Sequence, residues 1–317
     1  MTLRGVAIDF TVPTQDVVAS KWSVFEATGA TALTLIDSSA TVCNAPGEAF
    51  SAPLHSNVAI FRSTFETPTF GELENVAAET ERAAPSIRLD GVFARGEAAL
   101  FATNGVGDSL EARRCGFNVS GPIFWANETE RTGANAPSTG DERSTLSFDR
   151  TVVVGRSALA SLGEREDGSG ELTPLDASLT NSAIWLGGAS LATATTAREQ
   201  ETNPATVAWN LDGSLLLDAE PALRTRARQT ATTRDWPLAF DSPPNASAKL
   251  NDLNPDAVAR LLETPPHRFA STDFGRWILT PAQTSTALDS ATRKLVEEIK
   301  ATVVDGASTG ETRDAAF

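Results

Sequence analysis

The central segment of the chain's strand-rich part reads Gly105-Val106-Gly107-Asp108-Ser109-Leu110-Glu111-Ala112-Arg113-Arg114-Cys115-Gly116-Phe117-Asn118-Val119. It lies within residues 86–125, where short apolar runs alternate with turn residues such as Asp90-Gly91. Apolar runs separated by two-residue turns are typical of strands joined by hairpins. The pattern therefore predicts an antiparallel meander, in which Gly105 to Asp108 form one of the turns.

The same strand pattern extends over most of the chain. It recurs at residues 3–12, 58–65, 146–154, 183–186, 207–211 and 214–217, and Asp212-Gly213 is a further hairpin signal. We find no internal repeat at the spacing of a solenoid or a propeller. The expected fold class is mainly β (α+β), with an antiparallel β-sandwich or jelly-roll-like core and a few helices.

Helical patterns are few, and most lie near the C-terminus. Residues 71–83 form a first candidate helix, residues 255–263 a second, and residues 288–303 a third with Leu288, Leu295 and Ile299 on one face. The expected organisation is a β-rich core at 1–245 with a candidate internal boundary at 126–144. A helical segment at 246–306 and a polar tail at 307–317 follow.

The composition excludes several classes of protein. The chain has 317 residues and a formal net charge of −15, which repels nucleic acid and anionic membranes. No apolar run approaches the ~20 residues that cross a bilayer, and Met1 is not followed by a signal-peptide core. We therefore expect a soluble protein that is made in the cytoplasm, without direct nucleic-acid or membrane partners.

The residues that most often bind metals are sparse. Cys43, Cys115, His55 and His267 are scattered and do not form a four-ligand zinc pattern. Both cysteines lie in apolar, strand-like surroundings, where a buried free thiol is usual. Acidic clusters such as Glu164/Glu166/Asp167 are typical of a solvated face. No metal and no cofactor is expected.

Gly107-Asp108-Ser109-Leu110 resembles the nucleophile block of the Gly-Asp-Ser-Leu serine hydrolases. The resemblance implies Ser109 as the nucleophile and a histidine near the C-terminus as its base. His267 is the sole downstream histidine, and Thr264 stands where that family has an aspartate. The block also begins at residue 107, whereas in the family it follows the first strand. We keep Ser109 with His267 as an alternative site and expect Ser109 to be a turn or strand hydroxyl without a base.

Arg224, Arg226 and Arg228 recur at period two, which places them on one face of a strand. Three interpretations remain open: a nucleic-acid contact, a solvated strand face, and an interface with an acidic patch on a neighbouring subunit or partner. No aromatic side chain is interleaved for bases to stack on. We expect the three arginines to be interface residues.

The chain offers many short strands, polar loops and no recognisable catalytic constellation. This combination favours a structural or assembly protein, such as a virion or particle shell, a capsid component or its outer decoration, that contacts itself or another shell protein as part of an oligomer. The alternatives are the serine hydrolase and a carbohydrate-binding β-sandwich module. The second alternative predicts that some of Trp125, Trp185, Trp209 and Trp236 are exposed and coplanar.

Overall fold

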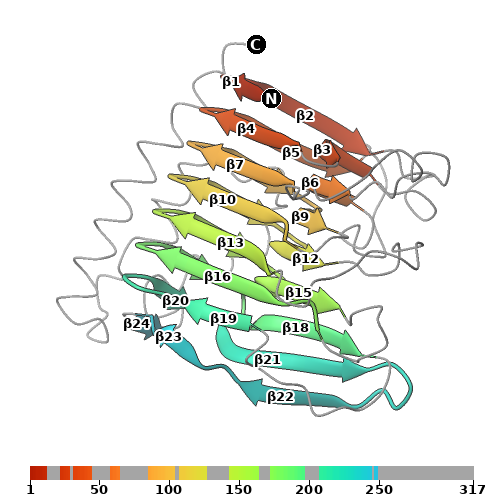
Figure 1. Cartoon of the computed structure of the whole chain (residues 1–317), viewed down its shortest axis with the longest axis vertical. Helices are drawn as coiled ribbons and strands as arrows, with labels where there is room; N and C mark the ends of the chain where they lie inside the picture. Colours follow the sequence, from red (N-terminus) through yellow and green to blue (C-terminus); the bar gives the residue numbers. More distant parts are fainter. Residues whose placement is uncertain are drawn as a thin grey trace, which may run out of the picture.

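The computed structural model shows a parallel β-solenoid in which the chain winds through three sheets, as the stacked strands of Figure 1 show. The structure describes residues 1–12, 22–28, 31–44, 58–64, 85–103, 107–126, 143–163, 172–196, 207–244 and 246–248. Each coil contributes one strand to each sheet, so that β1, β2 and β3 form the first coil and β19, β20 and β21 the seventh.

The strands are grouped here by sheet. Sheet A contains β1 (Thr2–Arg4), β4 (Ala32–Ile36), β7 (Ser86–Asp90), β10 (Ser109–Arg113), β13 (Ser144–Asp149), β16 (Leu175–Thr180), β19 (Val207–Asn210) and β23 (Phe240–Ser242). Sheet B contains β2 (Ala7–Val12), β5 (Ser39–Asn44), β8 (Phe93–Gly96), β11 (Gly116–Val119), β14 (Val152–Gly155), β17 (Ala183–Trp185), β20 (Leu215–Leu217) and β24 (Ala246–Ala248). Sheet C contains β3 (Trp22–Thr28), β6 (Val58–Thr64), β9 (Ala99–Thr103), β12 (Phe124–Ala126), β15 (Ala160–Gly163), β18 (Ser190–Thr196), β21 (Glu220–Ala227) and β22 (Thr233–Pro237).

The prediction of an antiparallel sandwich or jelly roll was wrong. Within the described residues, strands pair with the equivalent strands of neighbouring coils and run parallel to them, and the single antiparallel pair joins β21 to β22. The expectation that the chain has no solenoid repeat was also wrong. The described residues form no helix, and so none that could span a membrane.

The predicted hairpins are corners between two sheets. Strands β7 and β8 flank Asp90-Gly91, yet β7 pairs with β4 and β10 in sheet A, whereas β8 pairs with β5 and β11 in sheet B. The same holds for Asp212-Gly213 between β19 and β20. A two-residue hairpin of type I′ needs positive φ at both central residues, and between β7 and β8 Gly91 alone has it, at 65°. The chain therefore turns once and continues into the next sheet.

The core fills the space between the three sheets. In sheet A the side chains of Leu35, Leu89, Ala112, Phe148 and Leu179 form one inward column in register, each at most 3% exposed. Burying a leucine side chain contributes about 1.5–3 kcal/mol, so each column is a large source of stability. Alternate strand residues point outward, which explains the period-two pattern of the sequence.

Several expectations lie outside the described residues. The three candidate helices at 71–83, 255–263 and 288–303 and the tail at 307–317 belong to this part of the chain. Within the range assigned to the helical segment, β24 (Ala246–Ala248) is a strand that pairs with β20. The strands on either side of residues 127–142 belong to the same three sheets, since β10 pairs with β13 and β12 with β15.

Candidate functional site

Ser109 begins strand β10 on the outer face of sheet A. Its side chain is half-buried, and its backbone N–H donates to the Pro85 carbonyl at 3.1 Å. The residues beside it on the neighbouring strands are Ser86 and Thr145, whose hydroxyls do not serve as general bases. His267, the base that the alternative site requires, lies outside the described residues. The described surroundings of Ser109 thus bring no base to its hydroxyl.

Asp108, the residue before Ser109, is 2% exposed and lies buried in the solenoid. Its carboxylate accepts hydrogen bonds from the hydroxyls of Ser63, at 2.5 Å, and Thr103. Its backbone carbonyl accepts the Thr145 N–H at 2.9 Å. Asp108 therefore ties together groups from three coils at the corner that leads into β10, and the preceding Gly107 has the positive φ of 85° expected of a turn glycine.

A ladder of small polar side chains lines the inner side of the corner between sheets A and B. We call it the corner ladder; its members are Ser38, Cys115, Thr151, Ser182 and Ser214. Each side-chain oxygen or sulfur accepts the backbone N–H of the equivalent residue one coil earlier. The corresponding distances are 3.2 Å from Val6, 3.4 Å from Val92, 3.4 Å from Cys115, 3.0 Å from Thr151 and 3.3 Å from Ser182.

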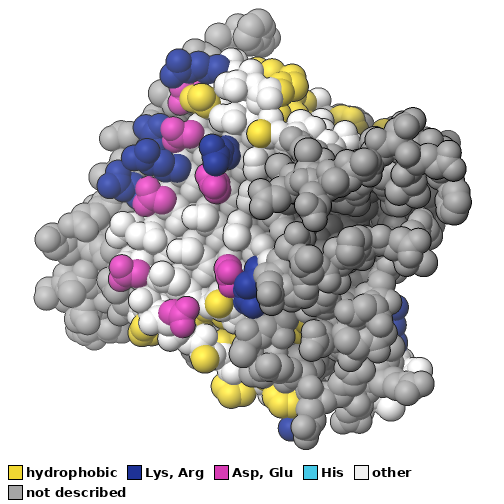
Figure 2. Space-filling view, in the orientation of Figure 1, with side chains coloured by type: hydrophobic (Ala, Val, Ile, Leu, Met, Phe, Trp, Pro, Cys, Tyr) yellow, Lys and Arg dark blue, Asp and Glu magenta, His cyan; other side chains and the backbone are white. Residues whose placement is uncertain are grey.

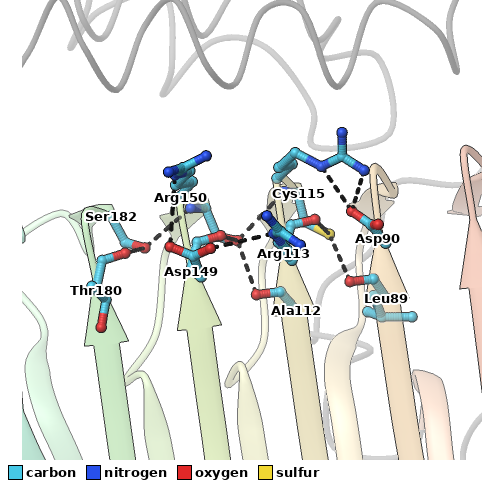
Figure 3. A network of polar contacts seen from close by, with 11 residues as sticks. Leu89, Asp90, Ala112, Arg113, Cys115, Asp149, Arg150, Thr180 and Ser182 are labelled. Carbon is cyan, nitrogen blue, oxygen red and sulfur yellow. Dashed lines mark hydrogen bonds and ion pairs between the residues drawn. The ribbon is translucent and has the colours of Figure 1, made fainter.

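Four ladder side chains also donate to the backbone carbonyl two residues earlier in their own coil, namely those of Ser38, Cys115, Thr151 and Ser182. Figure 3 shows this for Ser182, whose Oγ donates to the Thr180 carbonyl at 2.9 Å. In the coil before it, Thr151 Oγ1 donates to the Asp149 carbonyl at 3.1 Å. The hydroxyl of Ser214 instead donates to the Leu179 carbonyl of the preceding coil at 2.8 Å. A buried N–H without an acceptor costs free energy, and a side chain that both accepts and donates satisfies two corner groups at once. The ladder is therefore a structural element that repeats with the coils.

Cys115 takes one place in this ladder. Its thiol donates to the Arg113 carbonyl at 3.1 Å and accepts the Val92 N–H. Burial raises the pKa of the Cys115 thiol from 9.0 to about 12. The thiol therefore stays protonated at neutral pH and is a poor nucleophile and a poor metal ligand. Both Cys115 and Cys43 are free cysteines; the first is buried and the second half-buried.

The outer side of the same corner carries ion pairs. Figure 2 shows arginine and acidic side chains next to one another on this face of the molecule. Arg114, which has a positive φ of 54°, donates twice to Asp90 Oδ1, at 2.9 and 2.7 Å. The hydrogen bonds that Arg114 donates to Asp90 raise the pKa of the Arg114 guanidinium. Arg113 and Arg150 lie 3.5 and 3.9 Å from the Asp149 carboxylate. Exposed pairs of this kind contribute about 0–1 kcal/mol each.

The three arginines proposed as interface residues differ in their surroundings. Arg224 donates to Asp235 on β22 at 2.8 Å and to Glu220 at 2.8 Å, so its charge is satisfied within the chain. The hydrogen bond from Arg224 holds the pKa of the Asp235 carboxyl below its usual range. Arg226 and Arg228 are exposed, and no described acidic residue forms an ion pair with either side chain.

The four tryptophans of the carbohydrate-binding alternative lie on different parts of the solenoid. Trp185 and Trp209 are at most 2% exposed, and Trp125 and Trp236 lie half-buried on sheet C. Trp236 packs against the core, and the Arg234 guanidinium lies 4.0 Å from its ring centre. The described residues thus hold no coplanar platform of these four rings. They also contain no group of three or more His, Cys, Asp and Glu side chains that could hold a metal ion.

Sequence reasoning missed the corner ladder, although a signal for it exists. The ladder bonds join Cys115 to Thr151, Thr151 to Ser182 and Ser182 to Ser214, at separations of 36, 31 and 32 residues. A small polar residue that recurs at nearly constant spacing between two apolar runs is the mark of the repeat. No protein-family model matches the chain, and neither a curated protein nor a solved structure is significantly similar to it.

Proposed function

We propose that the chain is a non-catalytic structural protein that makes protein–protein contacts in an assembly, of the kind a particle shell or its outer decoration uses. Arg226 and Arg228 carry the proposal, because they are exposed and have no described acidic partner in a chain of net charge −15. Arg226 lies near the end of β21 and Arg228 in the turn that follows it, and guanidinium groups without a described acidic partner suit bidentate contacts with carboxylates. An acidic surface of a neighbouring copy is the partner that this charge distribution favours.

The ordered corner network supports the same proposal. Because hydrogen bonds repeat from coil to coil, the outer faces of the sheets form a rigid frame on which exposed side chains hold fixed positions. Asp108 and Cys115, two buried side chains of types that can take part in catalysis, are engaged in backbone and hydroxyl contacts of that frame. A serine hydrolase that uses Ser109 remains the second candidate, on its four-residue motif alone.

The proposal is tested by the salt dependence of self-association. Light scattering after gel filtration should show that the particle mass falls when salt rises from about 0.02 M to about 0.5 M, because the screening length shrinks over that range. The double variant Arg226→Glu/Arg228→Glu should lose the salt-dependent association. The control Arg88→Glu/Arg113→Glu, which reverses the same charge on sheet A, should keep it. A wild-type mass that is independent of salt would overturn the proposal.

A further inference from the structure

The two ends of the solenoid are built differently. At the C-terminal end, β22 turns back and pairs antiparallel with β21, and Trp236, Leu238 and Phe240 cover the last coil. Beneath them Trp209 and Leu223 are fully buried. Terminal repeats with a polar outer face are what keeps a solenoid soluble. Arg234 provides such a face where its guanidinium lies over Trp236.

The first coil has no such cover among the described residues. Its inward side chains Leu3, Phe10 and Phe25 are half-buried, although their register partners in the second coil, Leu35, Val42 and Phe61, are fully buried. Phe10 also contacts Trp22 across the coil, with ring centres 5.9 Å apart. Hydrophobic side chains are visible at this end in Figure 2. An apolar ring that is buried in every inner coil is therefore partly exposed at one end.

The strands of the first coil also have open edges. Strands β1, β2 and β3 are each the first of their sheet, and no described strand pairs with their outer sides. Met1 and Gly5 exchange backbone hydrogen bonds with β4, at 2.9 Å each, so the N–H and C=O groups of Thr2 and Arg4 point away from β4. Open edges of this kind bind another strand.

We propose that this N-terminal end is a docking surface for a second copy of the chain, stacked head to head. Three edges that no described strand pairs with surround one apolar ring, and the first coil of another copy is a partner that offers three edges with the same spacing. The C-terminal end does not, because β22 covers the edge of sheet C there. The pairing of β22 with β21 leaves the backbone nitrogen of Pro237 on the side of β22 that faces away from β21. Proline lacks the N–H that a further strand would need there.

The charges at this end are compatible with a symmetric pair. The exposed side chains of the first coil include both Arg4 and Asp9, so two copies do not meet with charge of a single sign. A two-fold axis perpendicular to the solenoid makes the facing strands antiparallel, which is a stable form of pairing. This surface is separate from Arg226 and Arg228, and it does not depend on the contact proposed for them.

The test is the particle mass at about 0.5 M salt, where exposed charge contacts are screened. We expect wild type at twice the 33.4 kDa mass of the chain. The variant Thr2→Pro/Arg4→Pro removes two outward N–H groups and keeps those that bind β4, so it should run at the mass of one chain with an unchanged circular dichroism spectrum. The control Thr233→Pro, on the outward side of β22, should stay at twice the chain mass.

Two results would overturn the inference. One is a wild-type protein at the mass of a single chain in high salt, whatever Arg226 and Arg228 do at low salt. The other is a double variant that folds and still runs at twice the chain mass. If the double variant does not fold, Thr2→Pro alone tests the same edge, since it leaves Arg4 and its ion pair with Asp37 in place.

Discussion

Ser182→Ala tests whether the corner ladder stabilises the solenoid. The Ser182 side chain is fully buried, accepts the Thr151 N–H at 3.0 Å and donates to the Thr180 carbonyl at 2.9 Å. Alanine removes the acceptor and leaves the Thr151 N–H buried without a partner. The Thr180 carbonyl keeps a second donor, the Arg150 N–H at 3.0 Å. The loss therefore comes from one orphaned donor, for which about 1–3 kcal/mol is expected.

Two further variants in the same coil separate this loss from a general effect of substitution. Ser178→Ala removes a hydroxyl from the outer face of β16, where it makes no hydrogen bond with a described residue, and should change stability by less than about 0.5 kcal/mol. Ser182→Thr keeps the hydroxyl, as Thr151 does at the equivalent corner, and should cost less than Ser182→Ala.

The assay is urea unfolding with hydrogen exchange as a second readout. The unfolding free energy should fall by about 1–3 kcal/mol for Ser182→Ala, at an unchanged m-value. Exchange of the Thr151 amide should accelerate in this variant more than exchange of amides in distant coils. If Ser182→Ala and Ser178→Ala are equally stable, and the Thr151 amide keeps its protection, the ladder does not contribute as argued.

Two further predictions concern the segment between β9 and β11. Gly107→Ala should lower the unfolding free energy by about 1–2 kcal/mol, because φ is 85° at this residue and a Cβ is strained at positive φ. Ser109→Ala should leave both the unfolding free energy and any esterase activity unchanged. Urea titration and an ester turnover assay check the two variants. The raised pKa of Cys115 means that the unfolded chain releases this proton first, so stability should fall as pH rises from about 9 towards 12. Cys115→Ser keeps a ladder donor and acceptor and should lose this part of the pH dependence, as measured by unfolding titrations. If the unfolding free energy of Cys115→Ser falls with pH as steeply as that of wild type, the prediction is contradicted.

The positions of most strands could be predicted from the sequence. Residues 58–65 were expected to form a strand and contain β6 (Val58–Thr64), and residues 207–211 contain β19 (Val207–Asn210). Alternation of inward and outward side chains is the same in a sandwich and in a solenoid, because it depends on the strand and not on its partner. The pattern therefore gives the class of local structure and does not determine which strands pair.

Pairing was mispredicted for a physical reason that particular corners illustrate. Asp90-Gly91 looks like a hairpin turn, but Arg113-Arg114, Asp149-Arg150 and Thr180-Asn181 occupy the same corner in the next three coils without a glycine. Arg114, Arg150 and Asn181 all have φ near 50°, a conformation that non-glycine residues seldom adopt. A sequence pattern does not predict an arginine in this conformation. The backbone conformation of the corner therefore repeats from coil to coil, while the residue types at the corner differ.

The interior position of the corner shows how far sequence reasoning could have gone. Three different residue types occupy this position at Ser38, Cys115 and Thr151. Each has one side-chain atom that accepts a backbone N–H and donates to a backbone carbonyl. Val92 occupies the same position and lacks such an atom, yet its N–H is still satisfied by Cys115 in the next coil. The constraint therefore acts between coils, on the residue that follows one repeat later. A search for the same residue at fixed spacing misses it, whereas a search for any small acceptor after a corner finds Ser182 and Ser214 as well. By this reasoning Gly107-Asp108-Ser109 is also a corner. The carboxylate of Asp108 accepts the hydroxyl hydrogen bonds of Ser63 and Thr103 there, just as the ladder side chains accept backbone N–H groups.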